Sequence, residues 1–287
     1  MWKAAIVIGA GLEGVRKIPS DRNYRMDVEA LRRAVREDRA AGRIPFAVVA
    51  TAGTTAVNAV DPLEEIAETA REENLWMHVD AAYGGAAAFL PEKRDLFRGW
   101  EMADTVVVNP HKWLFTPIDA SAFFFRDGEA LRHAFSLVPE YLRTTDDADE
   151  PMDYGFQLGR RFRSLKLWFV LRAFGRRGIE ERVRGHIDLA RDFAGRIDAH
   201  PAWERLAPAP FSTVCFRHRP DGEEDEEKLA ARNAAILERV NRSGEAYLSH
   251  AVLKGRYALR LAIGHIRTTP EDVDAAWSRL QEETART

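Results

Sequence analysis

The chain has 287 residues, of which 46% are hydrophobic, with 42 Lys and Arg against 45 Asp and Glu. A net charge of -3 gives no indication of the basic surface that binds nucleic acid. No apolar run reaches the roughly 20 residues that a membrane span requires. The single cysteine, Cys215, excludes an internal disulfide and fits a reducing compartment. We therefore expect a cytoplasmic protein of about two domains that binds neither nucleic acid nor membranes.

The first candidate motif is a glycine pattern near the N-terminus. Residues 9–14 satisfy G-x-G-x-x-G after the apolar run 4–8, which is typical of a dinucleotide site if a strand precedes it and a long helix follows. Here Pro19 interrupts the continuation, and no second strand with a terminal acid follows at the usual distance. The pattern is better explained as a glycine-rich turn.

Four short apolar segments predict strands in the first half of the chain, at residues 44–51, 75–79, 105–108 and 121–125. Between the first two, Asp61 and Pro62 are typical of a helix N-cap and first helical position. Apolar residues then recur at helical spacing: Leu63, Ile66, Ala67 and Ala70. Strands apolar on both faces that alternate with helices predict an α/β domain with a mainly parallel sheet.

The second half changes character after a polar, acidic segment at 144–153 that reads as an exposed loop. A long helical stretch covers 158–200, and strands are predicted at 212–217, 246–252 and 257–263. Helices are predicted at 226–241 and after a cap at Thr269. The pattern predicts a first domain over 1–165 and a small α+β domain over 166–287.

Polar residues that could take part in catalysis or ligand binding follow the predicted strands of the first domain. Thr51 ends one strand, Asp80 ends the next, and Asn109, His111 and Lys112 follow the third. Ligands of open α/β sheets bind at the carboxyl ends of the strands. Pyridoxal phosphate chemistry needs a lysine amine that forms a Schiff base and a carboxylate that keeps the pyridine nitrogen protonated. Lys112 and Asp80 supply this pair.

Structural alternatives compete with this interpretation. Asp80 and Lys112 could form an ion pair with each other in a buried turn, and His111 could serve only to support its neighbours. His78 and Asp80, two apart on one strand face, could instead bind a metal, although no third ligand is evident.

Four ordered motifs carry a family resemblance: A-T-A-G-T-T at 50–55, H-V-D-A-A-Y-G-G at 78–85, N-P-H-K-W at 109–113 and L-G-R-R-F-R-S-L-K-L-W-F at 158–169. In this order and spacing the chain resembles the group II pyridoxal-phosphate-dependent decarboxylases, and within them the aromatic L-amino-acid decarboxylases. The resemblance implies a type I, aspartate-aminotransferase-like fold with a large cofactor domain and a small C-terminal domain. It also implies a homodimer with active sites at the interface.

The resemblance assigns roles to individual residues. Lys112 would form the Schiff base, Asp80 would pair with the pyridine nitrogen, Ala82 would pack against the ring and Asn109 would contact the phosphate. The other residues expected to line the cofactor site are Thr51 and His111.

Tyr141, in L-V-P-E-Y-L-R-T, matches the tyrosine of the family's mobile catalytic loop, expected here at about 136–153. Its role in the family is to deliver a proton to the α-carbon after carbon dioxide leaves, across the dimer interface. Relatives with phenylalanine at this position behave as aldehyde synthases, so Tyr141 favours decarboxylation. Without the resemblance, an ordinary surface tyrosine would be the alternative interpretation of Tyr141.

Two further features refine the resemblance. Trp113, after His111 and Lys112, looks more like the aromatic branch of the family than the glutamate branch. The basic residues of the fourth motif are interpreted as structural ion-pairing groups: Arg160, Arg161, Arg163 and Lys166.

The predicted function is pyridoxal-phosphate-dependent decarboxylation of an aromatic L-amino acid to the arylalkylamine. The alternatives are a non-catalytic remnant, and a family member with another outcome, such as a decarboxylase of glutamate or histidine or an aldehyde synthase. Family members carry a long segment before the position of Met1, which includes the ring-stacking histidine and much of the substrate pocket. We therefore expect a shortened decarboxylase, whose substrate the sequence does not specify.

Overall fold

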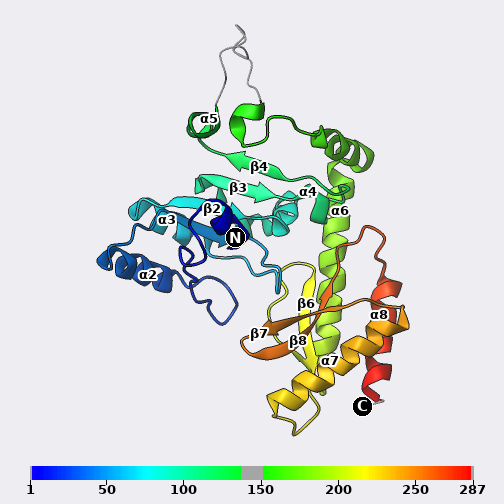
Figure 1. The fold of residues 1–287 in the computed structure, drawn as a ribbon. Helices are drawn as coiled ribbons and strands as arrows, with labels where there is room; N and C mark the ends of the chain where they lie inside the picture. The colour runs from blue at the N-terminus through cyan, green and yellow to red at the C-terminus, as the bar shows by residue number, and fades with distance from the viewer. Residues whose placement is uncertain (1, 137–150, 286–287) are drawn as a thin grey trace.

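The computed structural model describes residues 2–136 and 151–285. Two sheets lie at opposite ends of the described structure, and the long helix α6 (Arg163–Ala199) runs beside both (Figure 1). Each sheet has four strands, and each has a hydrophobic core of its own. No helix among residues 2–136 and 151–285 combines the length and apolar character needed to cross a bilayer.

The first sheet has the strand order β1-β2-β3-β4, from β1 (Ala47–Thr51), β2 (Trp76–Asp80), β3 (Thr105–Val108) and β4 (Ala122–Phe125). The first three strands are parallel and β4 is antiparallel to β3. All four predicted strands are present, and the prediction of a mainly parallel sheet is confirmed. β-branched residues suit the buried pleated surface of such strands.

One face of this sheet is covered by helices. Val48 and Ala50 of β1 and Met77 and Val79 of β2 are buried there, and α3 (Leu63–Glu72) packs on both strands. The helical spacing predicted for α3 is confirmed, because all four apolar residues of that face are buried. Helix α2 (Val28–Ala40), for which the sequence analysis gave no expectation, packs on α3 and begins at the N-cap Asp27.

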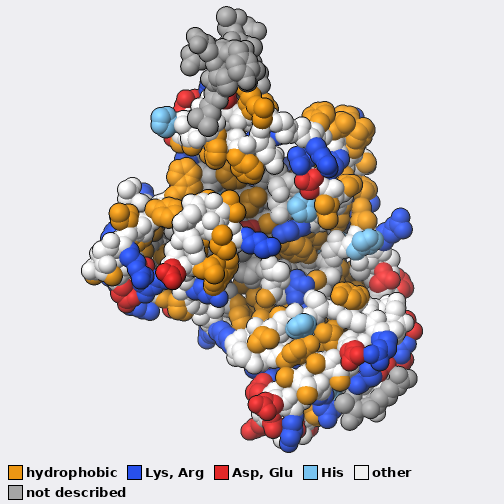
Figure 2. All heavy atoms as spheres, in the orientation of Figure 1, with side chains coloured by type: hydrophobic (Ala, Val, Ile, Leu, Met, Phe, Trp, Pro, Cys, Tyr) orange, Lys and Arg blue, Asp and Glu red, His pale blue; other side chains and the backbone are white. Residues whose placement is uncertain are grey.

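The other face of the sheet is partly open. Trp76, His78 and Asp80 alternate with the buried residues of β2 and are half-buried or exposed. Figure 2 shows hydrophobic side chains gathered around β4 and the start of α6. The exposed apolar residues in these two elements include Phe123, Phe124, Phe125, Trp168 and Phe169. His78 and Asp80 therefore lie on a sheet face that the described residues leave partly open.

Short helical segments lie between the strands of the first sheet or follow its last strand. They are η1 (Gly84–Phe89), η2 (Pro91–Phe97), η3 (Trp100–Met102), α4 (Pro110–Trp113), α5 (Gly128–Phe135) and η5 (Pro151–Tyr154). Segment η1 packs against β3 and against α6, so it links the sheet to the long helix.

The second sheet is antiparallel, with the order β5-β6-β8-β7. Its strands are β5 (Trp203–Arg205), β6 (Thr213–His218), β7 (Ser249–Leu253) and β8 (Arg256–Ala262). Helices α7 (Glu226–Ser243) and α8 (Pro270–Ala285) pack with it. The strands and helices predicted after residue 200 are confirmed, and β5 is an additional strand.

Helix α6 contributes to both cores. Gly175 (φ 63°, ψ 176°) interrupts it with a backbone conformation that glycine adopts without the steric cost of a Cβ. Beyond this point Ile179, Val183 and Ile187 lie in the first core. Residues 190–197 then supply four side chains to the second core.

The glycine motif at 9–14 follows a helix, α1 (Trp2–Val7), where the dinucleotide fingerprint requires a strand. Residues 11–14 form turns and residues 15–19 have no regular secondary structure, so no helix directly follows these glycines. The interpretation as a glycine-rich turn is confirmed.

Candidate active site

The carboxyl ends of three parallel strands bring the predicted site residues to one edge of the sheet. Thr51 is the register partner of Asp80, and Asp80 is the partner of Val107 on β3. The amide of Asn109 donates to the carbonyl of Ala82 at 3.1 Å, which joins the segments that follow β2 and β3. The structure thus brings together the three strand ends that the sequence analysis selected.

Asp61 fixes the end of β1, a role that the sequence analysis missed. Its carboxylate accepts hydrogen bonds from the amides of Thr51 and Met26, each at 2.7 Å. The prediction that Asp61 caps α3 is wrong, because Pro62 occupies the N-cap position and both carboxylate oxygens are taken by distant amides. Burial raises the pKa of Asp61, while the two amides oppose that rise.

Asp80 lies half-buried at the end of β2. One carboxylate oxygen, Oδ1, accepts a hydrogen bond of 3.0 Å from the amide of Ala82. This short loop turns Asp80 and Ala82 toward each other at the strand end. Among the residues that the structure describes, Asp80 has no ion-pair partner, so its second oxygen is available to a ligand.

Lys112 lies in the single turn of α4 and is exposed. Its amide donates to the carbonyl of Asn109 at 2.9 Å, which fixes the backbone of the turn. Within the two described ranges its amine has neither a hydrogen bond nor an ion pair. Lys112 and Asp80 do not pair with each other, so the structure does not contain the ion pair that was the alternative to a cofactor site.

Asn109 and His111 are held by the segment that leads into β4. Oδ1 of Asn109 accepts a hydrogen bond of 2.8 Å from the hydroxyl of Ser121, which leaves its amide nitrogen as a donor. Nδ1 of His111 lies 2.6 Å from the carbonyl oxygen of Ala120. The His111 ring is therefore anchored to the backbone of Ala120, as a supporting role requires.

His78 lies two residues before Asp80, and its Nδ1 is 2.9 Å from Oγ1 of Thr105. Burial lowers the pKa of His78, and the charge of Asp80 opposes this shift. Across residues 2–136 and 151–285, no group of three or more His, Cys, Asp and Glu side chains is arranged to hold a metal ion.

The remaining predicted residues divide into three groups. Ala82 is half-buried in the loop after β2. Tyr141, with most of the predicted catalytic loop, lies outside the described residues. In the fourth motif, Arg163 and Lys166 both form ion pairs with Asp119, at 2.9 and 3.9 Å, which confirms structural ion pairing for these two.

Trp113, the last residue of the turn that holds Lys112, is fully buried. Its ring stacks on Tyr83, with centroids 4.7 Å apart and an angle of 6° between the planes. The Tyr83 hydroxyl is 2.6 Å from Oγ of Ser212, and burial raises the pKa of Tyr83 to about 12. The contact between Tyr83 and Ser212 was not predicted, because 129 residues separate the two and no local pattern signals such a contact.

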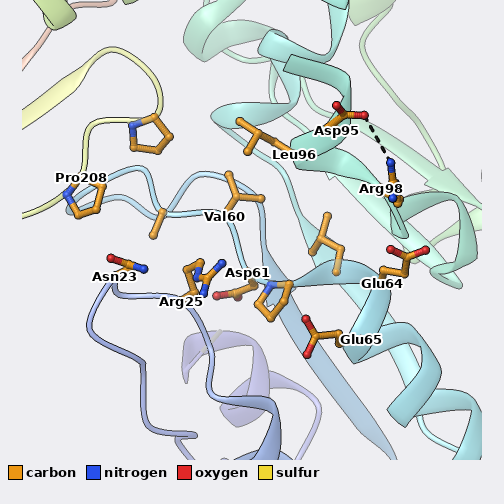
Figure 3. Close-up of a pocket in the computed structure, with 14 residues that line it drawn as sticks. Asn23, Arg25, Val60, Asp61, Glu64, Glu65, Asp95, Leu96, Arg98 and Pro208 are labelled. Atoms are coloured by element: carbon orange, nitrogen blue, oxygen red, sulfur yellow. Dashed lines mark ion pairs between the residues drawn. The ribbon is translucent and has the colours of Figure 1, made fainter. Parts of the chain in front are cut away.

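One cavity is lined by neither Thr51, Asp80 nor Lys112. It has a volume of about 600 Å³ and lies between the N-terminal segment, the start of α3 and the loop before β6 (Figure 3). Arg25, Asp61 and Pro208 contribute to its lining. None of the predicted cofactor residues lines it, so we place the candidate site at the strand ends instead.

The donor set at the strand ends fits pyridoxal phosphate. An unpaired primary amine suits an aldehyde, an unpaired carboxylate suits a protonated pyridine nitrogen, and a free amide NH₂ suits a phosphate oxygen. Lys112, Asp80 and Asn109 supply these groups from one edge of the sheet. The cofactor predicted from the sequence is therefore compatible with the structure.

Comparisons with known proteins identify the family. The pyridoxal-dependent decarboxylase conserved domain matches residues 1–219. Tyrosine decarboxylase 4 of Petroselinum crispum is 40% identical over 98% of this chain, and phenylacetaldehyde synthase of Arabidopsis thaliana is 40% identical over 99%. The crystal structure of Oryza sativa TDC with PLP and tryptamine superposes with a TM-score of 0.94 at 35% identity, over 99% of this chain.

These matches confirm the predicted type I fold. The chain covers 57% of the Petroselinum protein, 59% of the Arabidopsis protein and 60% of the Oryza chain in the crystal, so it spans less than two thirds of its relatives. The matched domain covers more than half of this chain. The chain belongs to the pyridoxal-dependent decarboxylases.

Proposed function

We propose that this protein decarboxylates an aromatic L-amino acid to the arylalkylamine and carbon dioxide, with pyridoxal phosphate as cofactor. The observation that carries the proposal is the pair Lys112 and Asp80. They follow neighbouring parallel strands, and neither has an oppositely charged partner among the described residues. Relatives named tyrosine decarboxylase and tryptophan decarboxylase support the aromatic substrate class.

The cofactor, when bound, supplies an aldehyde that captures the substrate amine and a pyridine ring that accepts the electron pair left by carbon dioxide. Lys112 would hold the aldehyde between turnovers and yield it to the substrate. Asp80 would keep a proton on the pyridine nitrogen, since a carboxylate stabilises the charged form of a neighbouring base. Asn109 would donate its NH₂ to the phosphate.

Other residues would complete the site. Ala82 would pack on the ring, while Thr51 and His111 would line the cofactor. His111, anchored on Ala120, would hold one orientation beside Lys112. Tyr141 would place a proton on the α-carbon of the product, reaching it from the second subunit of a homodimer.

A second candidate function is oxidative conversion to an aldehyde. Phenylacetaldehyde synthase of Arabidopsis thaliana is as similar to this chain, at 40% identity, as the tyrosine decarboxylase. The tyrosine at position 141 favours the amine as product.

The deciding experiment incubates the protein and pyridoxal phosphate with tyrosine, DOPA, tryptophan, phenylalanine, histidine or glutamate. Amine, aldehyde and carbon dioxide are quantified by mass spectrometry. We expect amine and carbon dioxide in equal amounts from one or more aromatic substrates. Glutamate as the sole substrate, or aldehyde as the main product, would refute the proposal, and stoichiometric cofactor binding without carbon dioxide would indicate the non-catalytic alternative.

Three further expectations accompany this function. Light scattering tests the homodimer, and cell fractionation tests the cytoplasmic location. The division into a cofactor domain (1–165) and a small domain (166–287) also remains a proposal, which limited proteolysis tests.

A further inference from the structure

Phe211 lies in the segment between β5 and β6, yet its side chain is buried in the first core. It is fully buried and stacks near Phe97 of η2, with ring centroids 6.1 Å apart. The second part of the chain therefore inserts an aromatic ring into the first part.

This ring meets all three segments that follow the parallel strands of the candidate site. After β3, its centroid lies 5.9 Å from the ring of Trp113, the residue next to Lys112. After β2, a Cβ at Gly84 would lie 2.7 Å from Cε2 of Phe211, and after β1 a Cβ at Gly53 would lie 3.5 Å from the same atom. Gly84 thus leaves space that the ring occupies, whereas at Gly53 the ring lies just beyond the point where a side chain would begin.

The neighbouring residue fixes the ring in place. The Ser212 hydroxyl is 2.6 Å from the Tyr83 hydroxyl, and the Ser212 carbonyl accepts a bond of 2.8 Å from the amide of Ile263. Ser212 is fully buried. The segment that carries Phe211 is therefore tied both to the loop after β2 and to the end of β8.

We propose that Phe211 is the positioning residue of the candidate active site, which holds the segments after β1, β2 and β3 in register with one another. This inference rests on the proposed function in one respect, namely that these segments carry Thr51, Asp80 and Lys112 as cofactor residues. The physical reason is that a single rigid ring in van der Waals contact with three segments removes their independent motions. A misplacement of about 1 Å in a reacting group costs about 100-fold in rate.

A cavity at Phe211 should act differently from a cavity elsewhere in the protein. This difference separates the positioning role from simple filling of the core. Phe193 offers a matched control, because it is also a fully buried phenylalanine but lies in the second core, packed on Phe216 at 5.1 Å. A Phe→Ala change at either position opens a cavity in a core and destabilises the fold. Only the change at Phe211 is expected to loosen the three segments selectively.

The test is hydrogen exchange of the full chain without cofactor, followed by peptide mass spectrometry. In Phe211→Ala we expect the amides of 52–55, 81–85 and 110–114 to exchange about tenfold faster than in the wild type. Phe193→Ala should leave these segments close to wild type, and Phe211→Leu, which keeps more of the ring volume, should restore part of the protection. Wild-type exchange in both Phe211 variants, or equal loosening by Phe193→Ala, overturns the proposal.

A second measurement separates this proposal from the proposed function. Pyridoxal phosphate is added, borohydride fixes the adduct, and the rate of labelling at Lys112 is compared among the same variants. We expect labelling to slow about tenfold or more in Phe211→Ala and far less in Phe193→Ala. A wild-type chain that is not labelled at Lys112 would refute the proposed function, whereas the exchange experiment would still decide the role of Phe211.

Discussion

The indole Nε1 of Trp113 donates a hydrogen bond of 3.0 Å to Nδ1 of His186 on α6. Because an indole N–H only donates, Nδ1 must accept, and the neutral His186 ring carries its proton on Nε2. Burial lowers the pKa of His186, and its bond with the backbone of His265 opposes this shift. The turn that holds Lys112 is thereby joined to α6 through a buried pair whose geometry requires a neutral histidine.

This pair predicts a coupled loss of stability. Trp113→Phe leaves the buried Nδ1 of His186 without a donor, and His186→Phe leaves the buried indole N–H without an acceptor. Each change should lower the free energy of unfolding by about 1 to 3 kcal/mol through the unsatisfied group. Urea unfolding of both single variants and the double variant should give a double-variant loss smaller than the sum, and strict additivity would contradict the coupling.

A second prediction concerns Asp61, whose two oxygens accept from the amides of Met26 and Thr51. Asp61→Asn preserves the shape but places an NH₂ group against one of these N–H donors. We expect a loss of about 1 to 3 kcal/mol in the free energy of unfolding. Glu64→Gln, at an exposed position of the same segment, is the control and should change the stability by less than about 0.5 kcal/mol. Equal effects of the two variants would exclude the special role of Asp61.

The proposed cofactor role of Lys112 gives a third prediction. Lys112→Ala should abolish both the visible absorbance band of the bound cofactor and its borohydride-fixed adduct at this position, since Lys112 is the one lysine in the turns directly after β1, β2 and β3, at 52–55, 81–85 and 109–113. Lys228→Ala, at a side chain 71% exposed on α7, is the matched control and should retain both signals. A reducible adduct of wild-type yield in Lys112→Ala would show that another lysine holds the cofactor.

Tyr141 gives a fourth prediction, which concerns the product. Without a phenol to place a proton on the α-carbon, Tyr141→Phe should divert the reaction with dioxygen toward aldehyde, ammonia and hydrogen peroxide. The ratio of aldehyde to amine should therefore rise, as measured by chromatography with a peroxide assay. An amine output at the wild-type rate would remove Tyr141 from the proton-delivery step.

The fifth prediction concerns pH. Burial, with smaller contributions from Arg232 and His200, lowers the pKa of His218 to about 4, whereas the unfolded chain titrates near 6.5. Between these values the unfolded state binds the proton and the folded state does not, so the free energy of unfolding falls as the pH drops from about 6.5 to about 4. His186 contributes in the same direction.

His218→Leu should flatten this dependence, because the group that takes up the proton on unfolding is gone. The measurement is the difference in unfolding free energy between variant and wild type at about pH 7.5 and about pH 5.5, where few carboxylates titrate. The wild type should lose more stability over this interval than the variant. Parallel pH profiles would show that His218 is protonated equally in both states.

Local sequence patterns were sufficient to predict the strands of the first sheet and the edge where the candidate site lies. Short apolar runs predicted β1, β2 and β3, and their carboxyl ends meet because parallel strands point the same way. Thr51 and Asp80 are register partners for that reason. Asp61 was wrongly predicted to cap α3. The pair Asp-Pro is typical of a helix start even where distant amides donate to the carboxylate.

Contacts between distant segments were beyond the reach of sequence patterns. Phe211 precedes a predicted strand and gives no local sign that its ring enters the other core. The same holds for Ser212. Its hydrogen-bond partner Tyr83 lies in the motif from which only Asp80 and Ala82 were predicted as site residues. Burial and long-range hydrogen bonding decide these positions, and neither is periodic along the chain.

Helix α6 limits where the chain can be divided into fragments that still fold. Ile179, Val183 and Ile187 complete the first core, and Phe211 completes it from still farther along the chain. A fragment that stops at residue 165 would expose cavities where these four side chains belong. We therefore expect a single heat-absorption peak in calorimetry, with both sheets melting together.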